Sequence, residues 1–197
     1  MKTLDAILTR RSTRKYLDKM IEADKLDSIL EAGIYAPSGG NNQANHFIVI
    51  ENKEILNELV TLVQEEFSKM EITEGMYKSL VSSIRQSKQG HYQFFYNAPI
   101  LIVIANLKDY DNAMADCACA IENMMIMANE LDLGSCYINQ LKWLNENNHI
   151  VDFFKKLGLD DHEKIFGSIC LGYPDTKDGK PIRTLLERKG NKITYLK

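Results

Sequence analysis

The chain has 197 residues, enough to bury a sizeable core, and we expect residues 1–197 to form a single domain. Its 45% hydrophobic and 26% charged residues exclude a disordered chain, and its formal net charge of -3 argues against nucleic acid as a partner. The longest apolar run, residues 98–105, is too short to cross a bilayer, and no signal peptide is visible, so we expect a cytoplasmic protein with no membrane partner.

The first part of the chain predicts two helices, a loop and a strand. Apolar residues at helical spacing predict helices from Thr3 to the Arg10-Arg11 pair and from Asp24 to just before Pro37. The proline and glycines of residues 37–42 predict a loop. The apolar run of residues 46–51 then predicts a strand.

The middle of the chain predicts a strand between two long helices. One apolar stripe predicts a helix over residues 54–70, whereas residues 71–97 have a weak pattern that indicates broken helix or a mobile lid. Residues 98–105 predict a strand buried on both faces. Residues 111–132 predict the longest helix, buried on nearly all sides, with Gly134 as the glycine that ends it.

The last part predicts strands over residues 135–139 and 165–172, with a helix over residues 145–157 between them. A polar tail follows, and its end, Ile193-Thr194-Tyr195-Leu196, has β-forming composition. Strands and helices alternate without clean βαβ units, so we expect an α+β fold with a mixed, mainly antiparallel central sheet flanked by helices.

No metal site is predicted. Cys117 and Cys119 are two apart in a helix and point away from each other, and no CxxC motif occurs. Cys136 and Cys170 lie alone in apolar surroundings, so all four cysteines are interpreted as plain buried residues. The four histidines show no ligand spacing, and standard catalytic motifs are absent. A bound cofactor would therefore carry any chemistry, with no catalytic side chain expected.

Two segments have the composition of a binding site. Arg10-Arg11-Ser12-Thr13-Arg14-Lys15 gathers guanidinium groups beside a hydroxyl, which suits a phosphate, although cations also favour a helix C-terminus. The loop of residues 36–43 has two glycines that permit close approach to a flat ligand, and Ser and Asn side chains that offer hydrogen bonds. Each segment alone has an ordinary structural interpretation as well.

Together and in this order, these segments resemble the nitroreductase family of FMN-dependent oxidoreductases. The family pattern has an Arg-Arg-Ser-x-Arg segment near residue ten and a Pro-Ser-x-x-Asn-x-Gln loop near residue forty. Asn97-Ala98-Pro99, Leu133-Gly134 and Leu171-Gly172 match its later motifs, so the resemblance covers nearly the whole chain. One departure is Gln43-Ala44-Asn45, where the family often has Gln-Pro-Trp, and we expect different packing under the loop.

The resemblance implies a cofactor site for FMN. It assigns the FMN phosphate and ribityl chain to Arg10, Arg11, Ser12 and Arg14, with Arg183 closing from the C-terminal side. Pro37, Ser38, Gly39 and Asn41 resemble the loop that a neighbouring subunit lends to the flavin, and the backbone of Tyr137, Ile138 and Asn139 matches the segment that faces its N5. Gln86, Lys88 and Gln89 are candidates for the pyrimidine edge.

The resemblance further implies an intertwined homodimer. It also implies a ping-pong reaction, in which NADH or NADPH gives a hydride to flavin N5. A flat acceptor, such as a nitroaromatic or quinone, then takes the hydride from the flavin. The long helix and the C-terminal segment are expected to hold the dimer together, although the segment has a second interpretation as a strand of its own subunit's sheet. Two other functions stay open: an FMN enzyme with other chemistry (flavin reduction or destruction, dehalogenation, dehydrogenation), or a non-catalytic protein that binds a phosphate-bearing ligand.

Overall fold

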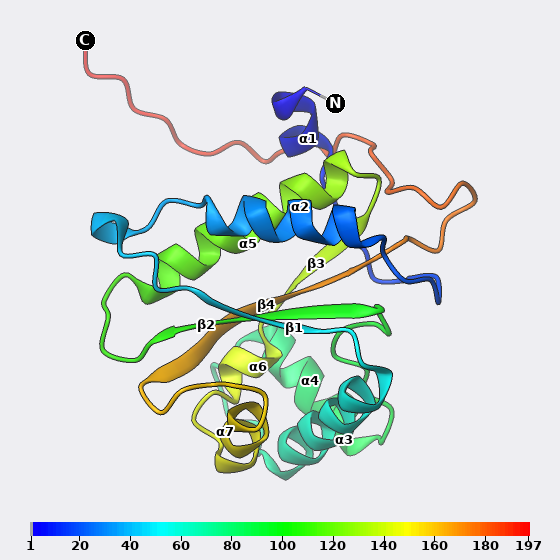
Figure 1. Cartoon of the computed structure of the whole chain (residues 1–197), viewed down its shortest axis with the longest axis vertical. Helices are drawn as coiled ribbons and strands as arrows, with labels where there is room; N and C mark the ends of the chain where they lie inside the picture. The colour runs from blue at the N-terminus through cyan, green and yellow to red at the C-terminus, as the bar shows by residue number, and fades with distance from the viewer. Residues whose placement is uncertain (1) are drawn as a thin grey trace.

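The computed structural model describes residues 2–197 and has a four-stranded sheet between two helical layers (Figure 1). The strand order is β1-β2-β4-β3, and every pairing between these strands is antiparallel. The strands are β1 (His46–Ile50), β2 (Ile100–Leu107), β3 (Gly134–Ile138) and β4 (Glu163–Gly172). The predicted α+β fold is confirmed. The mixed character of the sheet is limited to an isolated parallel bridge between Ser12 and Ser135.

The helices divide between the two faces of the sheet (Figure 1). One face carries α2 (Ala23–Ile34) and α5 (Ala113–Glu130), with α1 (Thr3–Thr9) packed on α5. The other face carries α3 (Lys53–Lys69), α4 (Lys78–Lys88), α6 (Gln140–Trp143) and α7 (Asn148–Lys155). None of the helices in the described part of the chain is long and apolar enough to span a membrane.

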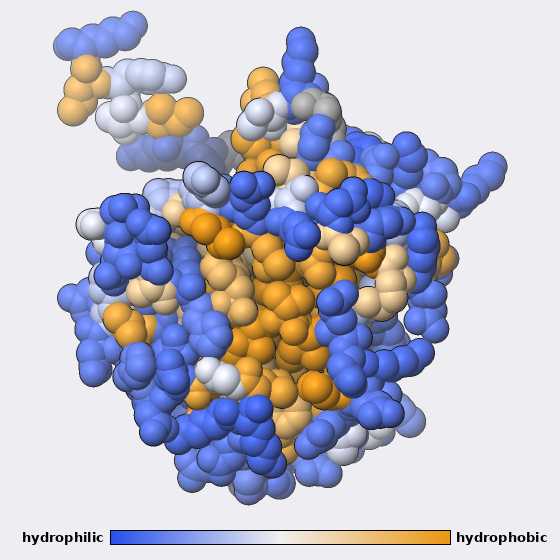
Figure 2. All heavy atoms as spheres, viewed as in Figure 1, coloured by the Kyte–Doolittle hydropathy of each residue, from blue (hydrophilic) through white to orange (hydrophobic). Residues whose placement is uncertain are grey.

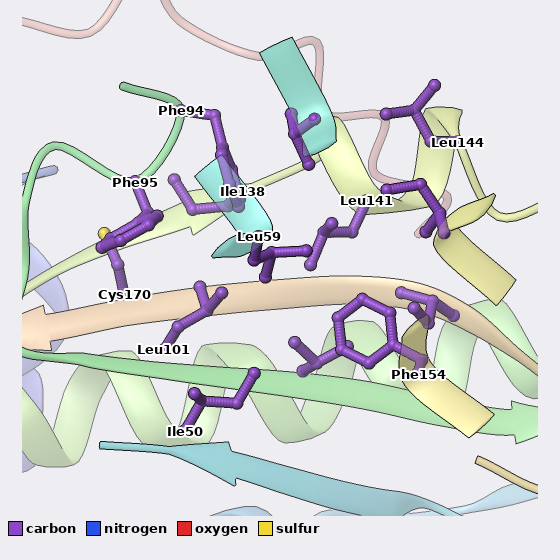
Figure 3. Packing of buried hydrophobic residues seen from close by; sticks show 14 of the residues in the cluster. Ile50, Leu59, Phe94, Phe95, Leu101, Ile138, Leu141, Leu144, Phe154 and Cys170 are labelled. Carbon is purple, nitrogen blue, oxygen red and sulfur yellow. The ribbon is translucent and has the colours of Figure 1, made fainter. Parts of the chain in front are cut away.

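The central strand β2 separates two hydrophobic cores. Its side chains alternate between the faces: Leu101 and Val103 enter the core that includes α3 and α7, whereas Ile102 and Ile104 enter the core that includes α2 and α5. All four are fully buried, as the unbroken apolar run predicts. Figure 3 shows Leu101 within the first of these cores, which also holds Leu59 and Phe154.

Of the two interpretations of residues 71–97, broken helix or a mobile lid, the structure shows the broken helix. The region contains helix α4, whose buried face carries Ile84 together with Ser83. The Ser83 hydroxyl lies 2.7 Å from the hydroxyl of Tyr92, which also accepts a 2.6 Å hydrogen bond from Gln140. A helix that buries serines in such a network lacks a continuous apolar stripe, which is why the periodicity is weak.

Gly134 does not end the long helix, so that prediction is wrong. The residue with a left-handed backbone after α5 is Asp132, with φ of 60°, and Gly134 instead begins β3. A Cβ atom on Gly134 would lie 2.6 Å from the Thr13 Oγ1 atom. The glycine is therefore required by close approach of the N-terminal segment to β3.

The predicted helix over residues 145–157 is shorter than expected. Helix α6 comes first, and α7 begins after Asn147, whose side chain accepts a hydrogen bond from Ile150 N at 3.2 Å. This capping contact fixes the helix start inside the predicted range.

Two apolar helix faces are left uncovered within the chain. Helix α1 exposes Leu4, Ile7 and Leu8 and buries Ala6 instead. Helix α5, predicted to be buried nearly all round, exposes Ala115 and Cys119 on its outer side. The interpretation of Cys119 as a buried residue is therefore wrong, while the other three cysteines are buried.

The C-terminal tail forms no strand in this chain. Residues 181–197 have neither helix nor strand, and Figure 1 shows the end of the chain running away from the two layers. Ile193, Tyr195 and Leu196 are exposed there, and Figure 2 shows apolar groups among polar ones on the segment that runs to the upper left. The interpretation that this segment pairs with its own subunit's sheet is therefore wrong, and its exchange between subunits stays a prediction.

A buried carboxylate joins two helices on the α3 side. Glu66 of α3 is buried and accepts hydrogen bonds from Lys69 Nζ at 2.5 Å, His149 Nδ1 at 2.8 Å and Asn147 Nδ2 at 2.8 Å. Burial alone would raise the pKa of Glu66, but these donors outweigh it and lower the pKa to about 2. The ionised form of Glu66 therefore stabilises the contact between α3 and α7.

We expect Glu66→Gln to lower the free energy of unfolding at pH 7 by about 1.5–3 kcal/mol, the usual contribution of a hydrogen bond to a charged group. The folded pKa lies below the unfolded value, so this stabilisation is present above the unfolded pKa of about 4.3 and is lost as pH falls through the folded one. Urea unfolding at pH 7 and pH 3 should show a smaller difference between variant and parent at pH 3. The exposed Glu58→Gln on the same helix is the control; an equal loss for Glu66→Gln at both pH values would contradict this account.

Candidate functional site

The cationic segment of residues 10–16 lies along the outer edge of β3. Ser12 forms a parallel bridge with Ser135, and Thr13 N donates to Ser135 O at 2.9 Å. Further along, Asp175 N donates to Lys15 O at 3.0 Å. These backbone contacts fix the segment beside the sheet, so its side chains are held in a defined place.

A pocket of about 410 Å³ opens beside this segment. Its wall is formed by the N-terminal segment, the turn after β4 and the start of the tail: Arg11, Ser12, Thr13, Arg14, Lys15, Pro174, Asp175, Thr176, Ile182, Thr184 and Leu186. Within residues 2–197, no carboxylate forms an ion pair with Arg11, Arg14 or Lys15. The lining contains one acidic residue, Asp175, and three cationic ones, so the pocket suits an anionic ligand.

Arg14 is held by a residue that sequence analysis did not single out. Its guanidinium carbon lies 5.8 Å from the centre of the Tyr96 ring, and its Nη1 lies 3.5 Å from Ser12 O. Tyr96 has a left-handed backbone with φ of 61°, directly before the Asn97-Ala98-Pro99 motif. Nothing in the local pattern of residues indicates this contact, because it depends on the packing of residue 96 against the N-terminal segment.

Three of the predicted phosphate ligands have partners in their own chain: Arg10 and Arg183 form ion pairs, and Arg11 donates to the carbonyls of Arg10 and Thr184. Arg10 Nε lies 3.6 Å from Glu122 Oε1. Arg183 donates to Asp132 Oδ1 at 2.7 Å and to both the side chain and the carbonyl of Asn129. The structure therefore brings Arg11, Ser12 and Arg14 together but directs Arg183 to the C-terminal end of α5.

The segment from Tyr137 to Asn139 follows the bridge along β3. Since Ser135 O points outward to Thr13, and backbone groups alternate along a strand, the backbone of Tyr137 points to the same open edge. The Ile138 side chain is buried, and Asn139 is the N-cap of α6. The predicted use of this backbone by a ligand is compatible with its direction.

The predicted glycine-containing loop lies elsewhere in the chain. Pro37 and Ser38 lead into a short 3-10 helix, η1 (Gly39–Asn41), at the end of α2 opposite the cationic segment (Figure 1). Gly39 N donates to Asp116 Oδ1 at 3.1 Å, and Asn45 Nδ2 donates to Asp116 O at 3.2 Å. Asn45, which departs from the family pattern, thus anchors the loop to α5. Within one chain the loop and the cationic segment do not meet.

The small size of Gly39 has a reason within its own chain. A Cβ atom at this position would lie 2.5 Å from Tyr110 Oη and closer still to Asn112 Nδ2. The hydroxyl of Tyr110 also donates to Gly39 O at 3.0 Å. The glycine is therefore needed for these contacts whether or not the loop also approaches a flavin.

We expect Gly39→Ala to lower the free energy of unfolding by about 1–3 kcal/mol through overpacking. Gly40→Ala is the matched control, since its φ of 60° costs about 1–2 kcal/mol of backbone strain while its Cβ meets open space. In an Asn112→Ala background, chemical denaturation should show that Gly39→Ala lowers the free energy of unfolding by less than it does in the parent. The decrease caused by Gly40→Ala should be the same in both backgrounds. Equal relief at both positions would show that the contact with Asn112 is not the cause.

The other candidate residues do not converge on the pocket. Gln86, Lys88 and Gln89 are exposed at the C-terminal end of α4, where Gln86 donates to Ser82 at 2.9 Å. His46 Nδ1 lies 2.8 Å from Glu163 Oε2. Within the part of the chain that the structure describes, no group of three His, Cys, Asp or Glu side chains is arranged to hold a metal ion.

Known proteins are similar to this chain in both fold and sequence. The model of the nitroreductase family matches residues 7–173. A nitroreductase from Bacteroides fragilis, solved with bound FMN, is 34% identical with a TM-score of 0.84, and the similarity covers 100% of both chains. A nitroreductase from Desulfitobacterium hafniense, also with bound FMN, is 28% identical with a TM-score of 0.82 over 100% of both chains.

A curated relative from Archaeoglobus fulgidus is 31% identical over 187 residues, which is 89% of this chain and 87% of the relative. Its name pairs NADH dehydrogenase with NAD(P)H nitroreductase.

Proposed function

Because the chain belongs to the nitroreductase family, we propose that it is an FMN-dependent oxidoreductase that transfers electrons from NADH or NADPH to a flat organic acceptor. Solved relatives that hold FMN and share the whole length of the chain support the choice of cofactor. The observation that carries the proposal is the pocket beside the cationic segment, where Arg11, Arg14 and Lys15 form no ion pair with a carboxylate of residues 2–197.

The residues at this pocket fit the chemical groups of FMN. A phosphate needs cations and hydrogen-bond donors, which Arg11, Ser12 and Arg14 supply. A flat ring system needs an adjacent strand edge, which the outward-pointing backbone of Tyr137 supplies on β3, outside the lining of the pocket. In this proposal Arg183 exchanges its bonds to Asp132 and Asn129 for the phosphate when the cofactor binds.

Bound FMN supplies the chemistry, because its N5 accepts a hydride from a nicotinamide and donates it to an acceptor. The task of the chain is to bind and orient. Arg14 and Ser12 fix the phosphate end, and the backbone from Tyr137 to Asn139 holds the reactive edge of the ring. No side chain of unusual acidity is required for a hydride step.

The functional unit of this proposal is a homodimer in which each subunit lends residues Pro37, Ser38, Gly39 and Asn41 to the other's flavin. The separation of this loop from the cationic segment within one chain supports the assignment (Figure 1). So do the apolar residues that α1 and the tail leave exposed. Ala115 and Cys119 on the outer side of α5 are small enough to permit close contact with a second helix.

Steady-state kinetics test the reaction. The flavin-loaded protein is assayed with NADH and NADPH against a quinone and a nitroaromatic at several fixed concentrations. Parallel double-reciprocal lines are expected, since nicotinamide and acceptor occupy the same cleft in turn. Converging lines would contradict the alternating use of one cleft, and no turnover of any flat acceptor would favour another flavin chemistry.

A further inference from the structure

Two cysteines lie directly opposite each other on neighbouring strands. Cys136 of β3 pairs with Cys170 of β4 in the antiparallel register, and both are free thiols in the core on the α3 side. Opposite residues of such a pair have Cα atoms about 4.5–5.5 Å apart, within the range of about 4.4–6.8 Å that disulfides span. The backbone therefore already has the spacing that a disulfide needs.

The surroundings of the pair make its two thiols unlike each other. A hydrogen bond from Cys170 lowers the pKa of Cys136, and Arg14 and Ser12 lower it further. Together these effects outweigh burial, which raises the pKa of this thiol. Burial raises the pKa of Cys170, whose Sγ lies 3.4 Å from the Tyr16 hydroxyl. Cys136 is thus suited to attack as a thiolate, while Cys170 stays protonated beside it.

The other two cysteines lack this arrangement. Cys117 is buried on α5, where burial raises its pKa to about 12, and its Sγ lies 3.2 Å from Asn45 Oδ1. Cys119 is exposed on α5. The chain therefore contains its own controls: one buried thiol without a partner cysteine and one exposed thiol.

We propose that Cys136 and Cys170 form a redox-active dithiol, which a peroxide oxidises to a cross-strand disulfide. The Cys136 thiolate attacks one oxygen of hydrogen peroxide, the O–O bond breaks, and hydroxide leaves to take up the proton that Cys136 had released. The Cys170 sulfur then attacks the sulfenic acid on Cys136, the S–O bond breaks, and the hydroxyl leaves with the Cys170 proton as a second water. Two thiols lose two electrons, and the peroxide gains them.

Oxidation also changes the charge next to the pocket. Arg14 and Ser12 lower the pKa of Cys136 and so favour its thiolate, and the disulfide removes that negative charge from beside them. We expect the oxidised protein to bind FMN several-fold more tightly than the reduced protein. This link rests on the proposed function, whereas formation of the disulfide does not.

Peptide mapping tests the disulfide directly. The reduced full-length chain is treated with one equivalent of hydrogen peroxide, alkylated in denaturant and cleaved after lysine. Cys117, Cys119 and Cys136 then lie on the fragment of residues 109–142 and Cys170 on the fragment of residues 165–177. We expect the two fragments to be joined, with a mass two hydrogen atoms below their sum, and to separate after reduction.

A second digestion after glutamate cuts at Glu122 and Glu130 and separates Cys136 from the other two cysteines, so the parent chain alone identifies the bond. The link should persist in Cys117→Ser and Cys119→Ser and disappear in Cys136→Ser. Separate fragments after peroxide treatment, or a link that survives Cys136→Ser, would overturn the dithiol. A disulfide that forms without changing the Kd for FMN would overturn only its connection to the flavin.

Discussion

Replacing Arg14 by alanine should weaken FMN binding about ten- to a hundredfold, equivalent to about 1.5–3 kcal/mol for a lost charge-assisted hydrogen bond. Arg14 lines the pocket beside the cationic segment and forms no ion pair with a carboxylate among residues 2–197, so its charge is available to a phosphate. The side chain is exposed, and its contact with the Tyr96 ring is worth only about 0.5–1 kcal/mol at such a site. The fold should therefore survive the change.

Titration of the apo protein with FMN, followed by quenching of flavin fluorescence, measures this effect. Arg14→Lys keeps the charge but loses the planar fork, so its affinity should lie between those of the parent and Arg14→Ala. Lys156→Ala, which removes an exposed cation at the end of α7, is the control for net charge. An Arg14→Ala protein that holds FMN as tightly as the parent would show that the phosphate site has been misplaced.

Deleting residues 191–197 should lower the melting temperature, shift the protein toward monomer and reduce the flavin that it retains. Ile193, Tyr195 and Leu196 have β-forming side chains and are exposed in a single chain. Strand β1 is an edge strand with an unpaired side, and Figure 2 shows apolar side chains gathered across the middle of the face where β1 lies. A tail from a second subunit that pairs there would cover both surfaces.

Analytical ultracentrifugation, thermal unfolding and flavin absorbance of the same preparation measure the three effects together. Replacing Ile193, Tyr195 and Leu196 by serine in the full-length chain should reproduce the deletion, whereas Asn191→Ser should have no effect. A truncated protein that remains a flavin-loaded dimer with an unchanged melting temperature would contradict the exchanged tail.

Regular periodicity predicts much of this fold correctly. The apolar stripe of α3 and the unbroken apolar run of β2 are both visible in local sequence, because each depends on the burial of whole faces. Helix α4 is the exception among the larger helices, since its buried side uses Ser83 and a hydrogen-bond network with Tyr92 and Gln140. A local sequence pattern does not predict hydrogen-bond partners that lie on other segments of the chain.

The candidate site is likewise predictable only in part. The cluster of cations from Arg10 to Lys15 is visible in the sequence. The contact of Arg14 with Tyr96 and the ion pair of Arg183 with Asp132 are tertiary contacts, which local sequence does not predict. The sequence predicts the wrong role for Gly134, because the Thr13 side chain that excludes a Cβ there is distant in sequence. A sequence motif predicts which residue types a site contains, whereas the contacts between those residues depend on the fold.

The most direct measurement is the visible absorption of the purified protein, reconstituted with FMN and titrated with NADH and then NADPH without oxygen. We expect one flavin bound per chain and loss of its absorption band with one equivalent of at least one nicotinamide, followed by recovery on addition of a quinone. A colourless protein that takes up no added FMN would contradict the account and favour a non-catalytic protein that binds another phosphate-bearing ligand.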